Sequence, residues 1–155
     1  MLDTQEEIYQ YLGKSLYVNA PEGFNSAWLE ISIFTVDKHS RESVGYFDGM
    51  DNRELELNID LNGEERMPDT DLAFYKLYHL MQKDESHMPW NKAKFTLTSE
   101  GKFDLEFKLD EDFEWFKKLD KDSKDYDDLD IKLERKVKKW EGLTEEESAR
   151  FRPVE

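Results

Sequence analysis

The sequence has no cysteine and no long apolar run, and each absence excludes a class of protein. Without cysteine the chain can form neither a disulfide nor a thiolate metal site, and it has no thiol nucleophile. No apolar run approaches the ~20 residues that a membrane-spanning helix needs. The N-terminus has no basic region followed by an apolar stretch, so we expect no secretory signal. These absences favour a cytoplasmic protein that does not bind a membrane.

Positive charge is also scarce. The chain has 37 acidic and 22 basic residues, which gives a net charge of −15. A surface of this charge repels phosphate backbones, so we expect no direct binding to nucleic acid. The same surface attracts a basic protein and speeds the encounter with it. An acidic surface can also serve solubility alone, and net charge does not distinguish these two roles.

Motifs of catalysis are missing as well. The histidines are scattered, and the sequence contains no G-x-S-x-G turn, no P-loop and no Rossmann glycine pattern. Residues 120–131 partly match a calcium-binding loop, but Lys124 occupies the fifth position and Ile131 replaces the closing glutamate. We therefore predict that the protein is not an enzyme and has no catalytic, cofactor-binding or metal-binding residues.

Aromatic residues are plentiful and indicate a folded protein, because acidic disordered chains contain few of them. Residues 88–109 predict a β-hairpin, since apolar and polar residues alternate on both of its arms. Gly101 can supply the positive φ that the turn between the arms needs. Trp90 precedes the first arm, where its ring can close one end of a core.

The other elements complete an α+β prediction. We expect helices at 3–14, 72–83 and 125–141, strands at 27–37, 43–48 and 54–61, and a last short helix that begins at the capping box of Thr144. The predicted fold is a single domain, 1–143, followed by a short extension, 144–155. It contains a mostly antiparallel sheet of about five strands, one central amphipathic helix packed on it, and short terminal helices.

Two acidic stretches are candidate partner-binding surfaces. The strand at 54–61 places Glu54, Glu56 and Asp60 on its outer face, although such a face is more often simply solvated. The segment 110–130 interleaves acids with aromatic residues, a composition suited to docking a basic partner. Its candidate residues are Asp110, Glu111, Asp112, Glu114, Trp115, Asp122, Asp125, Tyr126, Asp127 and Asp128. Alternatively, Trp115 and Phe116 anchor a short helix onto the domain.

Several short motifs follow one another in an order that a known family shares. They are Phe74–Leu77 on the central helix, Trp90 before the hairpin, Thr96–Phe103 through its turn, and Glu134-Arg135 with Trp140 near the end. With these motifs the chain resembles the YezG-like family of bacterial immunity proteins from about Gln5 to Leu143.

Members of that family are cytosolic antitoxins that bind and block the C-terminal domain of a secreted or contact-delivered toxin, often a nuclease. The resemblance implies that this chain is such an immunity protein, with no cofactor. A nuclease cleft is basic because it holds phosphates, so an acidic surface with aromatics can occupy it. We favour segment 110–130 as that surface. Two alternatives stay open, an acidic adaptor for another basic protein and a small carboxylate-dependent hydrolase.

Overall fold

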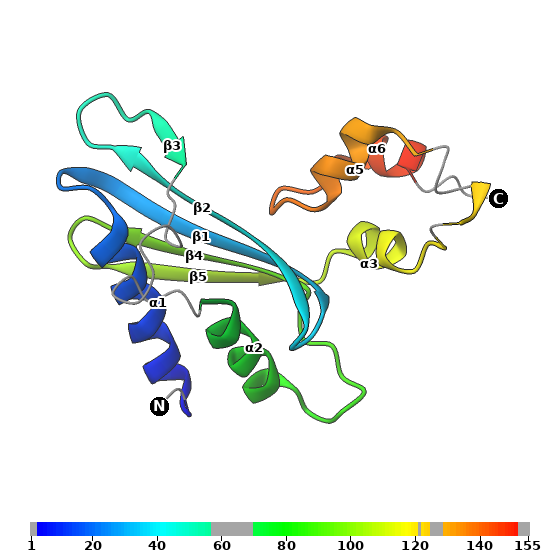
Figure 1. Ribbon diagram of the computed structural model, residues 1–155, viewed down its shortest axis with the longest axis horizontal. Coiled ribbons are helices and arrows are strands. Elements are labelled where there is room, and N and C mark those ends of the chain that lie inside the picture. The colour runs from blue at the N-terminus through cyan, green and yellow to red at the C-terminus, as the bar shows by residue number, and fades with distance from the viewer. Residues whose placement is uncertain (1–2, 57–69, 121, 125–128, 152–155) are drawn as a thin grey trace.

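The computed structural model describes residues 3–56, 70–120, 122–124 and 129–151, and it shows an α+β fold (Figure 1). The elements are α1 (Gln5–Asn19), β1 (Phe24–Thr35), β2 (His39–Asp48), β3 (Glu54–Glu56), α2 (Thr70–Met81), β4 (Lys92–Thr98), β5 (Phe103–Lys108), α3 (Glu111–Lys117), α5 (Ile131–Val137) and α6 (Glu145–Phe151). Figure 1 shows α1 and α2 along one side of the sheet, and α3, α5 and α6 gathered beyond one end of it. The predicted fold class is confirmed.

The sheet is antiparallel throughout, with the strand order β3-β2-β1-β4-β5. The central strand β1 is buried along most of its length, as its apolar and β-branched composition predicts. The predicted hairpin is confirmed as β4 and β5, and Gly101 in its turn has a φ of +90°. Because β5 is an edge strand, its Phe103 remains 51% exposed, although its ring stacks on Phe95.

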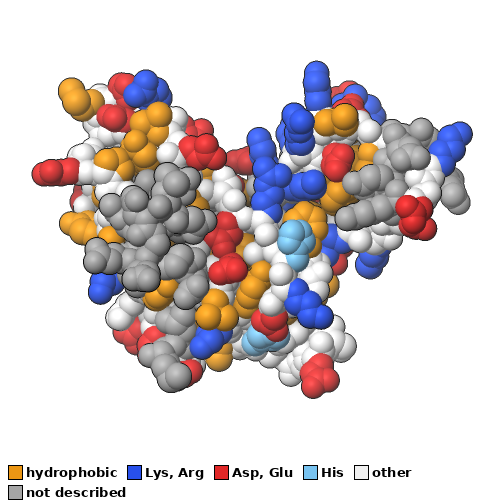
Figure 2. Space-filling view, in the orientation of Figure 1, with side chains coloured by type: hydrophobic (Ala, Val, Ile, Leu, Met, Phe, Trp, Pro, Cys, Tyr) orange, Lys and Arg blue, Asp and Glu red, His pale blue; other side chains and the backbone are white. Residues whose placement is uncertain are grey.

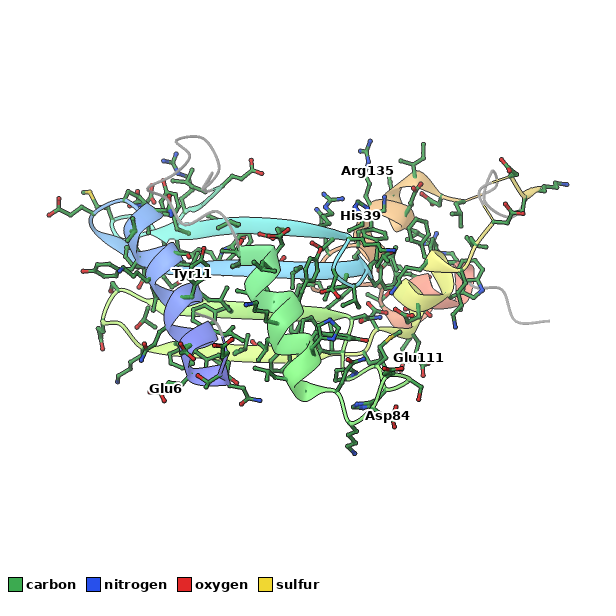
Figure 3. The ribbon with its side chains drawn as sticks, turned by 60° about the horizontal axis from the view of Figure 1, so that its bottom comes forward. Glu6, Tyr11, His39, Asp84, Glu111 and Arg135 are labelled. Carbon is green, nitrogen blue, oxygen red and sulfur yellow. The ribbon has the colours of Figure 1, made fainter. Side chains whose placement is uncertain are left out.

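One face of the sheet and the two helices α1 and α2 enclose the main hydrophobic core. Figure 3 shows both helices crossing this face. The core takes Leu29 and Ile31 from β1, and both helices contribute an apolar stripe of the amphipathic kind. Trp90 is fully buried, with its ring edge-on to those of Phe74 and Tyr78. It closes one end of the core, as predicted.

A second, smaller cluster belongs to the part that we call the C-terminal lobe, which comprises α3, α5 and α6. Its buried residues are Phe113, Phe116, Leu133, Val137 and Phe151. The capping box that was predicted at Thr144 is confirmed, because Thr144 and Glu147 exchange backbone-to-side-chain hydrogen bonds at the start of α6. Phe151, from the predicted extension, packs against Trp115 with the ring centroids 5.2 Å apart.

Three predicted elements near the N-terminus have wrong bounds. The strand predicted at 27–37 runs from Phe24 to Thr35 as β1. The first helix continues beyond residue 14 to Asn19, because Leu16 extends its buried stripe. Burial of a leucine is worth more than the ~1 kcal/mol that Gly13 costs inside a helix. Strand β2 starts at His39 instead of Ser43, since the backbone of its polar first residues pairs with β1. Two of those polar side chains also find partners, because Tyr75 donates to Ser40 and Thr70 donates to Glu42.

The last predicted long helix is also shorter than expected. Within the described residues α5 runs from Ile131 to Val137, and Lys138 caps it. Trp140 therefore lies beyond the helix, where the ammonium of Lys108 sits 4.4 Å from the centroid of its ring. The described residues do not include 125–128, which belong to this predicted helix. They also do not include 57–61, the remainder of the predicted strand that begins as β3.

Candidate functional site

The acidic segment that begins at Asp110 leads from the sheet into the C-terminal lobe. Asp110 is the N-cap of α3, and its Oδ1 accepts hydrogen bonds from the backbone N–H groups of Asp112 and Phe113. Its other carboxylate oxygen accepts a hydrogen bond of 2.6 Å from the ammonium of Lys92. The first acid of the predicted binding segment therefore joins the lobe to β4.

Lys92 is fully buried, which is unusual for a lysine. Besides Asp110, its ammonium donates to the backbone carbonyl of Lys139 at 2.6 Å. Burial lowers the pKa of Lys92, while the hydrogen bond and the charge of Asp110 act to raise it. One lysine side chain thus holds β4, the start of α3 and the segment after α5 together.

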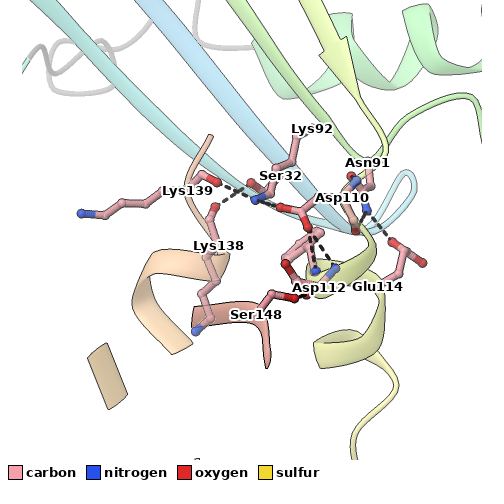
Figure 4. Close-up of polar contacts among 10 residues, drawn as sticks. Ser32, Asn91, Lys92, Asp110, Asp112, Glu114, Lys138, Lys139 and Ser148 are labelled. Carbon is pink, nitrogen blue, oxygen red and sulfur yellow. Dashed lines mark hydrogen bonds and ion pairs between the residues drawn. The ribbon is translucent and has the colours of Figure 1, made fainter. Parts of the chain in front are cut away.

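Further polar contacts surround this lysine, and Figure 4 shows them as one group. Ser32 on β1 donates to the carbonyl of Lys138 at 2.6 Å. Asn91 donates to the carbonyl of Asp110 and to the Glu114 carboxylate, and accepts from the Asp110 N–H. We call this group the polar junction; it comprises Ser32, Asn91, Lys92, Asp110, Glu114, Lys138 and Lys139. It connects the lobe to the face of the sheet opposite the main core.

The predicted residues of the acidic segment thus fall into four groups. Asp110, Asp112 and Glu114 have their carboxylates engaged inside the protein, Asp112 by a hydrogen bond of 2.6 Å from Ser148. Trp115 is half-buried against Phe151, which agrees with the alternative that aromatic residues anchor this helix. Glu111 and Asp122 are exposed, as is Asp120, an acid of the same segment outside the predicted set. Asp125, Tyr126, Asp127 and Asp128 lie outside the described residues.

The second predicted surface lies on the face of the sheet opposite α1 and α2, which we call the open face. Trp28 lies at its centre, and the strand register aligns it with Gly45 on β2 and Thr96 on β4. A Cβ at Gly45 would overlap the Trp28 ring, so only glycine lets this ring lie against β2.

Exposed carboxylates lie at both edges of the open face. Glu54 and Glu56 project from β3, and Glu56 is in register with Gly45. On the opposite edge strand, β5, Asp104 pairs with Thr96 and the exposed Glu106 pairs with Lys94. Two pairs of carboxylates therefore lie on either side of the central tryptophan. Asp60, the third acid predicted for the β3 strand, lies outside the described residues.

A cleft of about 240 Å³ separates the open face from the C-terminal lobe. Figure 2 shows the notch between these two parts of the molecule. Its lining carries acids and bases in equal number: Glu30, Glu54, Glu141, Arg41, Lys138 and Lys139. Burial raises the pKa of Glu30, and the nearby charge of Glu141 raises it further, while Lys94 at 3.8 Å opposes both effects.

Neither Trp28 nor Lys92 was singled out by the sequence analysis. Alternation within the strand at 27–37 would have placed Trp28 on the face opposite Leu29, but nothing indicated that Gly45 lay beside it. Lys92 becomes buried only because Lys139, 47 residues further along the chain, returns to it. Sequence patterns that span a few residues do not record such a contact.

Comparison with protein-family models and with curated proteins finds no match to this chain. Within the described ranges, no helix combines the length and apolar character that a membrane span needs. In the same ranges no three His, Asp or Glu side chains are grouped in a way that could hold a metal ion.

Proposed function

We propose that this protein is a cytoplasmic immunity protein that binds a basic toxin domain, with a nuclease as the expected target, and blocks it. The observation that carries the proposal is the open face, where exposed carboxylates flank Trp28 on both sides. The net charge of −15 adds a long-range attraction for a basic partner. The resemblance to the YezG-like family supplies the biological role.

The structure leads us to prefer a different surface from the one that the sequence favoured. Carboxylates that dock a partner must be accessible, but Asp110 and Glu114 accept hydrogen bonds within the polar junction. Glu54 and Glu56 are exposed, and Glu54 also lines the cleft beside the lobe. Exposed carboxylates on this face can set the orientation of a partner, while Trp28, which is only 9% exposed, packs against Gly45 beneath them.

The test is co-expression with the toxin domain encoded by a neighbouring gene, followed by pull-down, growth rescue and measurement of the dissociation constant. We expect the pair Glu54→Lys and Glu56→Lys to weaken binding at least about tenfold, mainly through a slower association rate. The matched control is Glu85→Lys with Glu100→Lys, which makes the same charge change at exposed loop positions.

A third pair, Glu111→Lys with Asp122→Lys, examines the exposed part of the acidic segment. If only this pair weakens binding, the segment and not the open face is the docking surface. If all three pairs have the same small effect, the attraction is a property of net charge alone. If no basic protein binds the wild type, the proposed function is wrong.

A further inference from the structure

A pocket of about 330 Å³ lies where the tip of the β1–β2 hairpin meets α3 and the end of α5. Its lining combines apolar side chains with basic or titratable ones: Phe34, Phe116, Leu119, His39, Lys117 and Lys138. None of the lining residues that the structure describes is acidic, although the chain as a whole has a net charge of −15. Its volume is within the usual range of about 300–1,000 Å³ for small-molecule sites.

The apolar part of this pocket is fixed by packing. The Phe34 ring lies edge-on to the fully buried Phe113, with the centroids 5.0 Å apart, and the centroid of the His39 ring lies 4.9 Å from that of Phe34. Phe116 is itself part of the buried cluster of the lobe. A ligand would therefore meet a preformed surface, which reduces the entropy lost on binding.

The two lysines are held in place by contacts on the lobe. The Lys138 ammonium sits 5.3 Å from the centroid of the Phe116 ring and 3.6 Å from the Glu134 carboxylate. The Lys117 ammonium sits 5.4 Å from the centroid of Phe113 and 2.7 Å from Glu114. Lys117 and Lys138 line the pocket, and neither of their glutamate partners does.

Positive charge continues from this pocket into the adjoining cleft. Lys138 lines both, and the cleft adds Arg41 and Lys139. Figure 2 shows Lys and Arg side chains gathered on the lobe side of the notch, with a histidine beside them. Figure 3 shows His39 and Arg135 at the same end of the molecule. The bases of the cleft are balanced there by Glu30, Glu54 and Glu141, whereas the described lining of the pocket carries bases without acids.

We propose that the pocket binds a small monocarboxylate with an aromatic or alkyl body. The body packs on Phe34 and Phe116, and the carboxylate lies toward Lys138 and Lys117. A neutral analogue would lose the charge interaction, and a cationic one would meet like charge in a partly desolvated site. This site goes beyond the proposed function, because it uses neither the exposed carboxylates nor the Trp28 surface.

The experiment is an NMR titration of the full chain with three probes of nearly equal shape: phenylacetate, phenylacetamide and phenethylamine. We expect phenylacetate to shift the backbone amides of Thr35, His39 and Leu119 in a saturable way. The neutral amide should bind about tenfold more weakly, and the amine should leave these signals unchanged. Equal shifts with all three probes, or no saturable shift with phenylacetate, would overturn the proposal.

Substitutions locate the site. Lys138→Gln should weaken phenylacetate binding about fivefold, since it removes one cation and leaves Glu134 without this partner. Lys102→Gln, in the exposed hairpin turn, makes the same charge change away from the pocket and should have no effect. Thr35→Glu adds a carboxylate at an exposed lining position and should abolish binding without disturbing the core. Unaltered affinity in both pocket variants, with the fold verified by circular dichroism, would refute the site.

Discussion

The main core and the C-terminal lobe contain the same kinds of apolar residue, but they are stabilised in different ways. The main core lies between a five-stranded sheet and two helices, and its contacts are almost entirely apolar. The lobe buries a small cluster within short helices, and it meets the sheet through the polar junction. Helices of this length are marginal by themselves in water, so the lobe depends on contacts with the sheet.

The difference has an energetic consequence. Apolar burial is not directional, whereas a buried ion pair stabilises only when every partner is present in good geometry. The main core can therefore lose one contact and keep its arrangement, but the lobe can detach if the polar junction loses one member. We expect the lobe to open at lower free energy than the sheet.

The largest expected loss of stability comes from replacing a buried phenylalanine by alanine, once in the main core and once in the lobe. Phe95→Ala and Phe113→Ala each remove a fully buried ring. Phe95→Ala should lower the free energy of unfolding by about 3–5 kcal/mol and accelerate hydrogen exchange throughout the sheet. Phe113→Ala should accelerate exchange in α3, α5 and α6 while the sheet amides keep their protection. Equal loss of protection in the sheet with both variants would show that the two regions unfold together.

Removal of the buried cation should have the next largest effect. Lys92→Met leaves the Asp110 carboxylate without its ammonium partner, so we expect a loss of about 3 kcal/mol in urea unfolding. Lys94→Met is the matched control, because its ion pair with Glu30 is longer, at 3.8 Å, and partly exposed; it should cost at most about 1 kcal/mol. Similar losses in both variants would mean that the polar junction is no stronger than a surface ion pair.

The same contrast explains which parts of the structure the sequence predicted. The hairpin of β4 and β5 was predicted correctly because period-two alternation and Gly101 are signals within a few residues of one another. The lobe was not. Asp110 is a helix cap and the partner of Lys92, but in sequence it looks the same as an acid that faces solvent. Whether Asp110 is buried or faces solvent depends on its contact with Lys92 on β4, 18 residues earlier in the chain.

Polar surfaces were predictable where one strand carries them. The outward placement of Glu54 and Glu56 on β3 was expected from alternation, and their exposure agrees with it. The remaining parts of the open face, Trp28 against Gly45 with Asp104 and Glu106 on the far strand, require the strand order. Alternation within a strand predicts which side chains share a face, but it does not predict which strands are neighbours in the sheet.

The smallest expected effect is a pH dependence confined to the lobe. Glu147 accepts hydrogen bonds from the Lys136 ammonium at 2.6 Å and from the backbone N–H of Thr144 at 3.0 Å, and so joins α5 to α6. The hydrogen bond from Lys136, followed by that from Thr144, lowers the pKa of Glu147 from 4.5 to about 2. Because the folded-state pKa is depressed, the stabilisation is fully present above about pH 4.5 and disappears as the pH falls toward about 2.

Hydrogen exchange measured across this range should show α6 losing protection before the sheet does. Glu147→Gln cannot ionise, so it should remove this pH dependence and leave α6 less protected at neutral pH. Glu145→Gln, an exposed change in the first turn of the same helix, should keep the wild-type profile. If α6 and the sheet lose protection at the same pH in the wild type, the lobe does not respond separately to acid. The inference that the lobe opens independently of the sheet would then be wrong, even if Phe95→Ala and Phe113→Ala gave the expected exchange patterns.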